Sequence, residues 1–434
     1  MLKIKSLFFF VILLLLLTDT FYSQQFDWKA LRFAPSAARH DDMHFITPDL
    51  GWIVNSSGQI YKTSDGGKNW TKQFQSSVYF RSLKFADSLR GWAGTIDEDK
   101  VLYHTNDGGL NWNLITNIPD PKPKRICGLA VPNDSVIYGS GAFDGPAIII
   151  KSTDGGQTWE SIDMSQYAGN LIDIYFLNSD SGFVVGGTPA KQILFDTKPI
   201  VLFTGDGGKT WEVRYSGNNV GEWGWKIVFP TKNISYVSLE NLNEARIIKT
   251  IDGGNTWSEI PVNDLSDLEG IGFYSENIGW VAARQEEKIT LDGGITWQQT
   301  DIGEQINRFQ FFGDTLAYAA GVTIYKLTKS VVTDITDMKI INKNFFLLQN
   351  YPNPFNPSTN ITFSLPNSAN VRLKIYNGLG QSVKVLLNEF MHSGKHTVPW
   401  DGKDENGNIV SSGFYIYRID AGNNAQSKMM ILLK

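Results

Sequence analysis

The chain has 434 residues, of which 42% are hydrophobic, and its 39 Lys and Arg against 44 Asp and Glu give a formal net charge of −5. This acidic balance argues against a general nucleic-acid-binding protein, because such proteins carry a basic excess or a basic stripe. The hydrophobic content is sufficient for the cores of one large and one small domain, which excludes disorder over most of the chain.

Residues 1–23 have the layout of a cleaved secretory signal peptide. Lys3 and Lys5 precede an uninterrupted apolar run at residues 7–17, and a short polar stretch follows. The run is too short to span a bilayer comfortably, so we expect cleavage after Ser23 and a mature protein that does not span the membrane. A retained N-terminal anchor is the alternative. No Cys follows the run, which argues against lipoprotein attachment.

Cys127 is the single cysteine of the chain, so an exported form cannot contain an internal disulfide. The residue lies beside a predicted strand. We therefore expect a buried structural side chain rather than a catalytic thiol.

Residues 24–327 consist of a unit that repeats at intervals of 40 to 52 residues. Each unit opens with an apolar anchor residue, and an aromatic residue follows seven positions later. The pairs are Phe45/Trp52, Phe85/Trp92, Val131/Tyr138, Phe176/Phe183, Phe229/Tyr236, Phe273/Trp280 and Phe311/Tyr318. A further apolar side chain lies two positions before each anchor, which is strand periodicity. A third strand leads into a DGG phrase and a fourth begins at the Trp after it. This pattern predicts an all-β, seven-bladed β-propeller, with a solenoid as the alternative.

The seventh unit ends after its third strand, and the missing fourth strand is expected from the beginning of the chain. The segment FDWKAL at residues 26–31 is similar to the segments that follow the DGG phrases. We therefore expect the strand of Trp28 to pair with residues 321–327. This N-terminal strand would close the ring and leave no open sheet edge.

The DGG phrase occurs six times, whereas a catalytic acid is needed once or twice per site, so the repetition indicates scaffolding. Its Asp is expected to accept backbone N–H groups, its glycines to adopt positive φ, and its Trp to bury a large ring. The alternating carboxylates of a calcium loop are missing. The phrase resembles the Asp box of sialidase-type propellers. The resemblance implies structural roles for Asp65, Trp70, Asp107, Trp112, Asp154, Trp159, Asp206, Trp211, Asp252, Trp257, Asp292 and Trp297.

Candidate binding residues lie three to six positions before each anchor, where the mouth of the central channel is expected. These windows contain Arg39, His40, Tyr79, Arg81, Arg125, Trp223, Trp225 and Arg308, together with Asp42, Asp173, Lys226 and Glu269. Arg and Trp often carry binding energy at interfaces, and Trp also stacks on sugar rings. We predict a binding site at this mouth, with a solvated rim and packing aromatics as the alternative. No metal and no cofactor are expected.

The combination of an upstream GW phrase with TxDGGxxW over residues 26–327 resembles the photosystem II assembly and stability factor family of seven-bladed propellers. The resemblance implies a non-catalytic role in binding or assembling protein partners, and not photosynthesis. No partner-contacting residue is carried over, because the shared pattern is mostly structural. The alternative is a sialidase-like or xyloglucanase-like glycoside hydrolase with a carboxylate pair among Asp42, Asp173 and Glu269. The sialidase Arg-Ile-Pro phrase is absent, and such xyloglucanases use two propellers.

Residues 346–434 alternate strand-like segments with turn clusters, which predicts a small C-terminal Ig-like antiparallel β-sandwich. The segments YPNPFNPST, WDGKDENGNIVSSGFYIYR and KMMILLK closely resemble the type A sorting domain of the type IX secretion system. This resemblance implies a Bacteroidetes-like bacterium, export through the periplasm, and cleavage in the linker at 328–345. Asp401 and Asp404 are interpreted as solvated turn carboxylates. The combined hypothesis is a secreted or cell-surface, non-enzymatic propeller that binds a protein or glycan partner.

Overall fold

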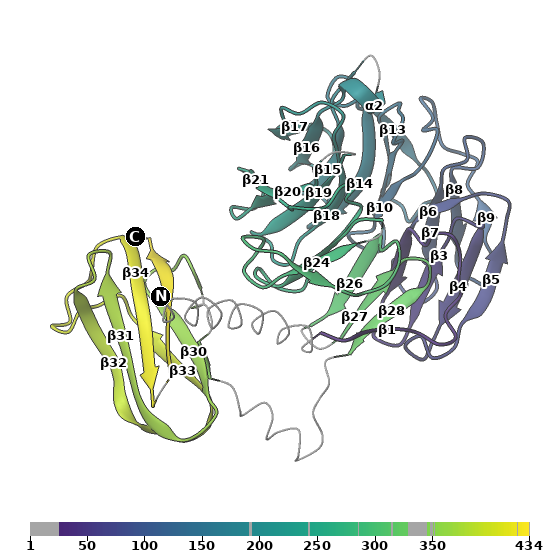
Figure 1. Cartoon of the computed structure of the whole chain (residues 1–434). Helices are drawn as coiled ribbons and strands as arrows, with labels where there is room; N and C mark the ends of the chain where they lie inside the picture. Colours follow the sequence, from purple (N-terminus) through teal and green to yellow (C-terminus); the bar gives the residue numbers. More distant parts are fainter. Residues whose placement is uncertain are drawn as a thin grey trace, which may run out of the picture. The chain divides into compact units, whose positions relative to one another are not determined.

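The computed structural model describes residues 26–190, 193–241, 244–284, 286–313, 316–328, 345–347, 350, 352–422 and 424–433. The predicted signal peptide, and the predicted linker between residues 328 and 345, lie outside the described residues. The chain forms two compact units, residues 1–329 and residues 330–434 (Figure 1). Within the described ranges, no helix combines the length and the apolar character needed to cross a membrane.

The first unit contains seven four-stranded antiparallel sheets in chain order, which are the blades of a β-propeller (Figure 1). The first strands are β2 (Asp42–Phe45), β6 (Phe80–Phe85), β10 (Gly128–Ala130), β14 (Asn170–Phe176), β18 (Trp223–Val228), β22 (Gly270–Phe273) and β26 (Arg308–Phe312). Neighbouring first strands contact one another around the ring, and β26 returns to β2. The predicted seven-bladed propeller is therefore confirmed.

The remaining strands build each blade outward from its first strand. The second strands are β3 (Gly51–Val54), β7 (Gly91–Thr95), β11 (Ile137–Gly141), β15 (Gly182–Gly187), β19 (Ser235–Glu240), β23 (Gly279–Ala282) and β27 (Leu316–Ala320). The third strands are β4 (Gln59–Thr63), β8 (Leu102–Thr105), β12 (Ile148–Ser152), β16 (Pro199–Thr204), β20 (Arg246–Thr250), β24 (Glu287–Thr290) and β28 (Ile324–Thr328). The fourth strands are β5 (Thr71–Gln75), β9 (Asn113–Leu114), β13 (Glu160–Asp163), β17 (Glu212–Ser216), β21 (Ser258–Pro261), β25 (Gln298–Thr300) and β1 (Trp28–Ala30). A short helix, α2 (Ile193–Asp196), precedes β16.

Strand β1 completes the seventh blade from the other end of the chain. It pairs antiparallel with β28, with Trp28 opposite Leu327 and Ala30 opposite Tyr325. The predicted closure is confirmed, and the ring joins its first and last strands by backbone hydrogen bonds rather than by a covalent link.

Aromatic stacking across blade boundaries explains the repeated residue pairs. Phe85 of the second blade stacks on Trp52 of the first with ring centroids 3.7 Å apart, and Phe45 stacks on Tyr318 of the seventh blade at 4.0 Å. A Cβ atom at Gly51 would lie 2.4 Å from the Phe45 ring, so the glycine before Trp52 allows the ring to approach. Each pair therefore belongs to one blade in sequence but contacts two neighbours in space.

The DGG phrase forms the turn between the third and fourth strands. Thr63 Oγ1 donates to Asp65 Oδ1 at 2.9 Å and accepts the Gly67 N–H at 2.9 Å, and Asp65 Oδ1 also accepts the Asn69 N–H at 2.9 Å. Gly66 and Gly67 have φ of 70° and 83°, a conformation that favours glycine. Hydrogen bonds from the side chain and backbone of Asn69 hold the pKa of Asp65 at about 2. The turn is thus satisfied by its own polar groups, as expected for a structural element.

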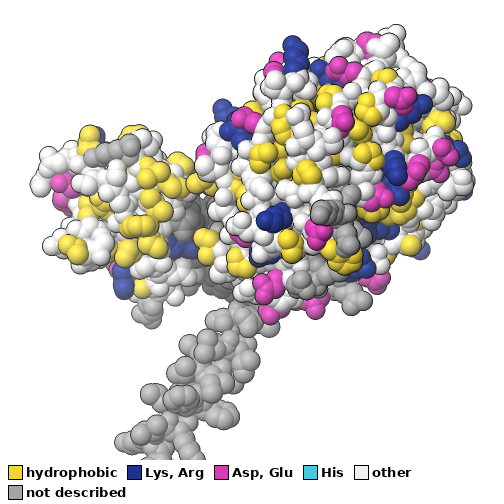
Figure 2. Space-filling model, turned by 90° about the horizontal axis from the view of Figure 1, so that it is seen from above, with side chains coloured by type: hydrophobic (Ala, Val, Ile, Leu, Met, Phe, Trp, Pro, Cys, Tyr) yellow, Lys and Arg dark blue, Asp and Glu magenta, His cyan; other side chains and the backbone are white. Residues whose placement is uncertain are grey.

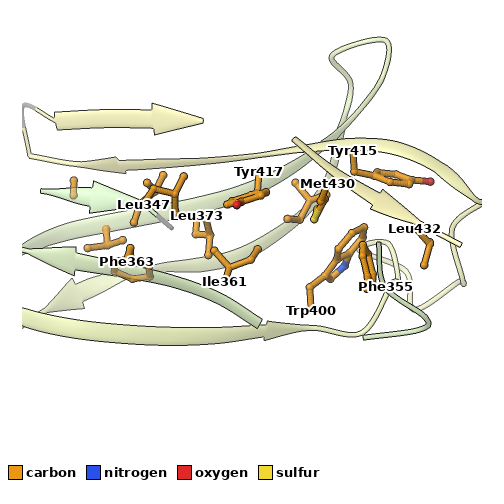
Figure 3. Packing of buried hydrophobic residues seen from close by; sticks show 14 of the residues in the cluster. Leu347, Phe355, Ile361, Phe363, Leu373, Trp400, Tyr415, Tyr417, Met430 and Leu432 are labelled. Atoms are coloured by element: carbon orange, nitrogen blue, oxygen red, sulfur yellow. The ribbon is translucent and has the colours of Figure 1, made fainter. Parts of the chain in front are cut away.

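The second unit packs two antiparallel sheets around one core (Figure 3). One sheet contains β29 (Phe346–Leu347), β30 (Thr359–Leu365) and β33 (Gly394–Trp400), and the other contains β31 (Ala369–Asn377), β32 (Ser382–Met391), β34 (Gly413–Ala421) and β35 (Asn424–Leu432). Trp400 and Tyr417, one from each sheet, are fully buried in this core. Asp404 accepts the Asn406 and Asn408 N–H groups, which places it in a turn.

Candidate functional site

The seven first strands line the channel, so residues at equal distances before the anchors form layers. The inner layer, three positions before the anchors, consists of Asp42, Ser82, Gly128, Asp173, Lys226, Gly270 and Arg308. The middle layer, four positions before them, consists of Asp41, Arg81, Cys127, Ile172, Trp225, Glu269 and Asn307. The mouth layer, six positions before them, consists of Arg39, Tyr79, Arg125, Asn170, Trp223, Asp267 and Gln305. The middle layer is buried throughout, whereas five members of the mouth layer are partly or fully exposed.

Backbone irregularities allow consecutive residues of one strand to reach the channel. The pairing of β6 with β7 shifts register between Phe80 and Ser82, and that of β18 with β19 shifts between Gly224 and Lys226. The skipped residues are Arg81 and Trp225. Because a bulge redirects a side chain out of the regular alternation, Arg81 and Trp225 meet across the channel, with the guanidinium carbon 4.6 Å from the ring centroid.

In the inner layer, Arg308 joins two carboxylates from different blades. Its Nε lies 2.8 Å from Asp42 Oδ1, and its Nη1 and Nη2 each lie 3.2 Å from an oxygen of Asp173. Asp42 also accepts the Leu83 N–H at 2.9 Å, and Asp173 accepts the Ile227 N–H at 3.2 Å. Burial alone would raise the pKa of Asp173, but Arg308 and Lys226 outweigh it and hold that pKa at about 2.

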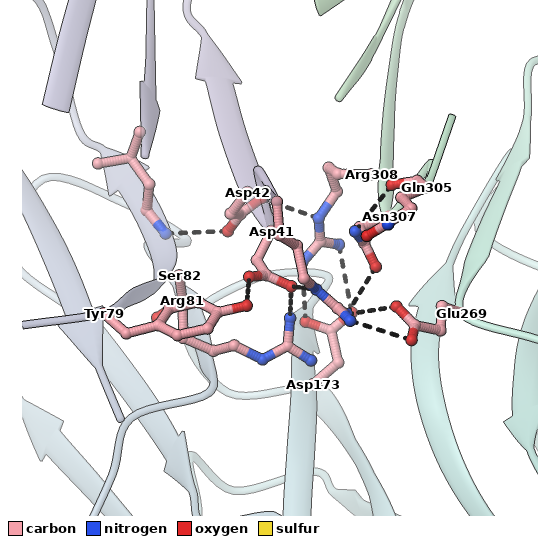
Figure 4. Close-up of polar contacts among 12 residues, drawn as sticks. Asp41, Asp42, Tyr79, Arg81, Ser82, Asp173, Glu269, Gln305, Asn307 and Arg308 are labelled. Carbon is pink, nitrogen blue, oxygen red and sulfur yellow. Dashed lines mark hydrogen bonds and ion pairs between the residues drawn. The ribbon is translucent and has the colours of Figure 1, made fainter. Parts of the chain in front are cut away.

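In the middle layer, Asp41 is the hub of the polar network (Figure 4). Its side chain is completely buried. It accepts Arg39 Nε at 2.6 Å, and it also accepts hydrogen bonds from Arg81 Nη1 and the Tyr79 hydroxyl. Arg39 also donates hydrogen bonds to Glu269 and to Asn307, whose Oδ1 lies 2.8 Å from Arg39 Nη2. Burial would raise the pKa of Asp41, but Arg81 and Arg39 outweigh it, so the pKa stays below its usual value.

Three carboxylates gather beside the mouth layer. One oxygen from each of Glu240, Asp267 and Glu269 can be chosen so that all lie within 4.8 Å of one another. Donors already contact all three, because Trp223 Nε1 lies 2.7 Å from Glu240 Oε2, Arg284 pairs with Asp267, and Arg39 pairs with Glu269. Burial, reinforced by Glu269, raises the pKa of Glu240 to about 8. Glu240 therefore holds a proton at neutral pH, which reduces the repulsion among the three groups.

The predicted site residues separate into an accessible group and a buried group. Arg39, Tyr79, Arg125 and Trp223 lie in the mouth layer and are partly exposed, whereas Arg81, Trp225 and most of Arg308 lie deeper. Arg125 pairs with Asp144 and lies over the Phe143 ring. His40 belongs to the buried group, because its side chain is completely buried and its Nδ1 lies 2.8 Å from the Gly321 carbonyl. Cys127 is buried, as predicted.

The sequence pattern did not single out several polar residues of this region, among them Asp41 and Glu240. Asp41 lies four positions before Phe45, inside the window where the mouth was expected, and its position matches that of Arg81 in the second unit. When one blade carries an acidic residue and another blade carries a basic residue at the same repeat position, the two side chains can form an ion pair across the channel, as Asp41 and Arg81 do. Glu240 ends β19, a second strand, so a pattern based on first strands does not include it.

The carboxylates predicted for a hydrolase do not form an acid and base pair. Asp42 and Asp173 are both buried and both contact Arg308, and the pKa of each is lowered despite burial. Two ionised carboxylates joined by one guanidinium lack the proton donor that glycoside hydrolysis needs. Glu269 is similarly engaged by Arg39.

Two family profiles match separate segments of the chain. Residues 22–143 match Photosynthesis system II assembly factor YCF48, and residues 352–425 match the FlgD Ig-like domain. The photosystem II assembly lipoprotein Ycf48 of Trichormus variabilis is 27% identical over 177 residues, and that of Nostoc sp. is 30% identical over 183 residues. Each alignment covers 32% of this chain and 52% of the relative, so the chain spans about half the length of the curated relatives it matches.

Solved structures extend the similarity to the fold. Ycf48 bound to D1 peptide is 20% identical with a TM-score of 0.53, covering 70% of this chain and 97% of that chain. PorZ, a surface component of the type IX secretion system of Porphyromonas gingivalis, is 13% identical with a TM-score of 0.54, covering 94% and 61%. A GH74 enzyme of Niastella koreensis is 13% identical with a TM-score of 0.51, covering 93% and 74%. The chain therefore shares its propeller fold with Ycf48 and with GH74 enzymes, and its C-terminal unit matches an Ig-like domain.

Proposed function

We propose that the propeller is a non-catalytic binding module that captures a segment of a protein partner at the channel mouth, with a glycan as the second ligand class. The observation that carries this proposal is the partly exposed mouth layer, whose Arg and aromatic side chains are held in place by polar partners. Arg39 pairs with the buried Asp41 and Glu269, and the Tyr79 hydroxyl donates to Asp41. Trp223 Nε1 donates to Glu240, and Arg125 pairs with Asp144. Such fixed Arg and aromatic side chains bind with little loss of conformational entropy. The solved Ycf48 with a D1 peptide is a protein of the same fold that binds a peptide.

The charge of the surface supports a local site rather than a broad electrostatic one. On the face of the propeller seen in Figure 2, Lys and Arg side chains are interspersed with Asp and Glu. A mixed surface of this kind attracts neither nucleic acid nor a strongly charged polymer at long range. Selectivity then depends on the few side chains at the mouth.

We expect the double substitution Arg125→Ala and Trp223→Ala to weaken capture of a peptide or glycan by about 10- to 100-fold, as for interface residues that carry most of the binding energy. The full chain and the variant are compared on arrays of peptides and glycans at several salt concentrations, with the melting temperature measured in parallel. Arg81 and Trp225 are left intact because they are buried, and their replacement would disturb folding.

The matched control is Arg90→Ala with Leu110→Ala, which removes a half-buried Arg and an exposed large apolar side chain outside the three channel layers. Unchanged capture by the mouth variant, or equal loss in the control, would contradict the proposal. Release of a sugar from an arrayed glycan, abolished by Glu240→Gln, would instead favour the hydrolase, because Glu240 carries a proton at neutral pH.

We also propose that residues 1–23 are a signal peptide and that residues 346–434 are a type IX sorting domain, joined to the propeller by a linker at 328–345. The C-terminal sequence similarity supports this assignment, which would place the mature propeller at the cell surface or in the medium. In a bacterium that has this secretion system, we expect the full chain in the outer or medium fraction and a chain ending at residue 345 in the periplasm. Equal export of both chains would exclude the sorting role.

A further inference from the structure

Lys226 is a buried amine in the inner layer of the channel. Its side chain is 1% exposed, and its Nζ has no hydrogen-bond partner among the described residues. Isolated buried ammonium groups are costly, so such groups are normally paired or bound to a ligand. Binding of a peptide at the mouth layer would not provide a partner for this buried amine, because Lys226 lies in the inner layer.

The two carboxylates of the inner layer are already committed to other donors. Asp173 accepts two hydrogen bonds from Arg308 and one from the Ile227 N–H. Asp42 forms an ion pair with Arg308 and accepts a hydrogen bond from the Leu83 N–H. Neither carboxylate forms an ion pair with Lys226 in the described part of the chain. They reduce the electrostatic cost of the Lys226 charge from a distance but do not accept its protons.

A second unused donor comes from the opposite side of the channel. Arg81 is 4% exposed, and while its Nη1 donates to Asp41, its Nη2 has no hydrogen-bond partner among the residues that the structure describes. The Arg81 guanidinium lies over the ring of Trp225, the residue next to Lys226, which places the two cationic side chains in adjacent layers. Trp225 Nε1 is also buried and has no partner in the described chain.

None of the described protein groups accepts a hydrogen bond from Lys226 Nζ or from Arg81 Nη2. The thiol of Cys127 lies near Arg81 and Lys226 in the middle layer, but burial raises its pKa, so it remains neutral. Burial, reinforced by repulsion from Arg308, lowers the pKa of Lys226 to about 7, although Asp173 and Asp42 act in the opposite direction. An anion within hydrogen-bond distance would offset this repulsion and favour the charged amine.

We propose that Lys226 Nζ and Arg81 Nη2 together bind one small monovalent inorganic anion, of the size of a halide, inside the channel. The size follows from enclosure, because Lys226, Arg81 and Trp225 are all more than nine-tenths buried, and a phosphate or an organic carboxylate would require the layers to open. The single charge follows from the donors, since the Arg81 charge is shared with Asp41, whereas the described residues give Lys226 no directly paired counterion.

Halide binding is tested on the full chain by chlorine-35 NMR line broadening, with bromide as the competitor and gluconate as the balancing anion. We expect saturable broadening in the wild type and about 10- to 100-fold weaker binding in Lys226→Met, which removes a charge-assisted hydrogen bond while keeping the side-chain volume. The control Lys72→Met removes an exposed lysine of β5 and is expected to change nothing. Equal broadening in wild type and Lys226→Met would mean surface halide only and would overturn the proposal.

A second measurement keeps the proposal testable if Lys226→Met does not fold. Crystals of the wild-type protein grown in bromide are expected to show one anomalous peak within hydrogen-bond distance of Lys226 Nζ. Diffraction from ordered crystals without that peak would overturn the proposal. The mouth variant Arg125→Ala with Trp223→Ala should retain the peak, because its residues lie in a different layer, so failure of this inference is distinguishable from failure of the peptide-binding proposal.

Discussion

Replacing Asp41 by Asn is expected to lower the free energy of unfolding of the propeller by about 3–5 kcal/mol, the usual cost of removing one partner from a buried ion pair. The carboxylate is completely buried and accepts hydrogen bonds from Arg39, Arg81 and Tyr79. An amide has the same shape but no charge, so two guanidinium groups would lose a shared counterion. Urea unfolding followed by tryptophan fluorescence measures this loss.

The fluorescence signal reports mainly on the propeller, because Trp400 is the one tryptophan of the chain that lies beyond residue 345. The control is Asp134→Asn at an exposed turn, where the carboxylate is 78% exposed and its distance to Arg90 is 3.6 Å. Surface pairs of this kind contribute about 0–1 kcal/mol, so the control should differ little from the wild type. A loss in Asp41→Asn no larger than in the control would show that the network does not stabilise the ring.

The pH dependence gives the Asp41 prediction a defined sign. The pKa of Asp41 in the folded protein lies below its ordinary value of 3.8, so its stabilising contribution is present above that value and is lost as the pH falls through the folded pKa. The difference between the wild type and Asp41→Asn should therefore be constant near neutral pH. It should shrink only below pH 3.8.

Replacing Trp28 by Ala is expected to destabilise the propeller by about 3–5 kcal/mol, the range for removing a large buried aromatic side chain. The ring packs edge-on against Trp280, with centroids 5.6 Å apart, and against Phe309 at 5.7 Å. Its strand β1 spans only Trp28–Ala30, so this side chain supplies most of the apolar contact that holds the closing strand.

The matched control for Trp28 is Phe33→Ala, which removes an aromatic side chain that is 61% exposed a few residues further along the chain. Both variants are unfolded in urea, and limited proteolysis near residues 26–31 monitors opening of the seventh blade. We expect faster cleavage only in Trp28→Ala, because loss of its ring releases β1 from β28. Equal stability and equal cleavage in the two variants would show that β1 is held by its backbone hydrogen bonds alone.

The repeated features of the propeller were predictable because each depends on a few neighbouring residues. The Thr63, Asp65 and Gly67 turn is satisfied within a handful of positions, and the Phe45/Trp52 spacing is set by two short strands and their connection. The pairing of Trp28 with Leu327 is a long-range contact, but the incomplete seventh unit already indicated it. Counting the copies was then enough to predict the number of blades.

The binding residues were predictable only as a set of positions along the first strands. The window before each anchor contained the channel-lining side chains, but it could not distinguish Arg125, which reaches the mouth layer, from Arg81, which is used inside the protein. His40 precedes β2 and does not reach the accessible surface, because its side chain is buried with Nδ1 against the Gly321 carbonyl. Along a regular strand, side chains alternate between the two faces. The bulges at Arg81 and Trp225 interrupt that alternation without a sequence signal that we could identify.

Local periodicity thus specified the fold, from the four strands of a blade to the strand that closes the ring. Ring closure decided which charged side chains form ion pairs inside the protein and which remain accessible. It brings Asp42, Asp173 and Arg308 together from the first, fourth and seventh blades. These residues are separated by more than a hundred positions, and the energy of each ion pair depends on burial that exists only in the closed ring. Strand patterns record which face is apolar, whereas charge pairing across a channel depends on the completed tertiary structure.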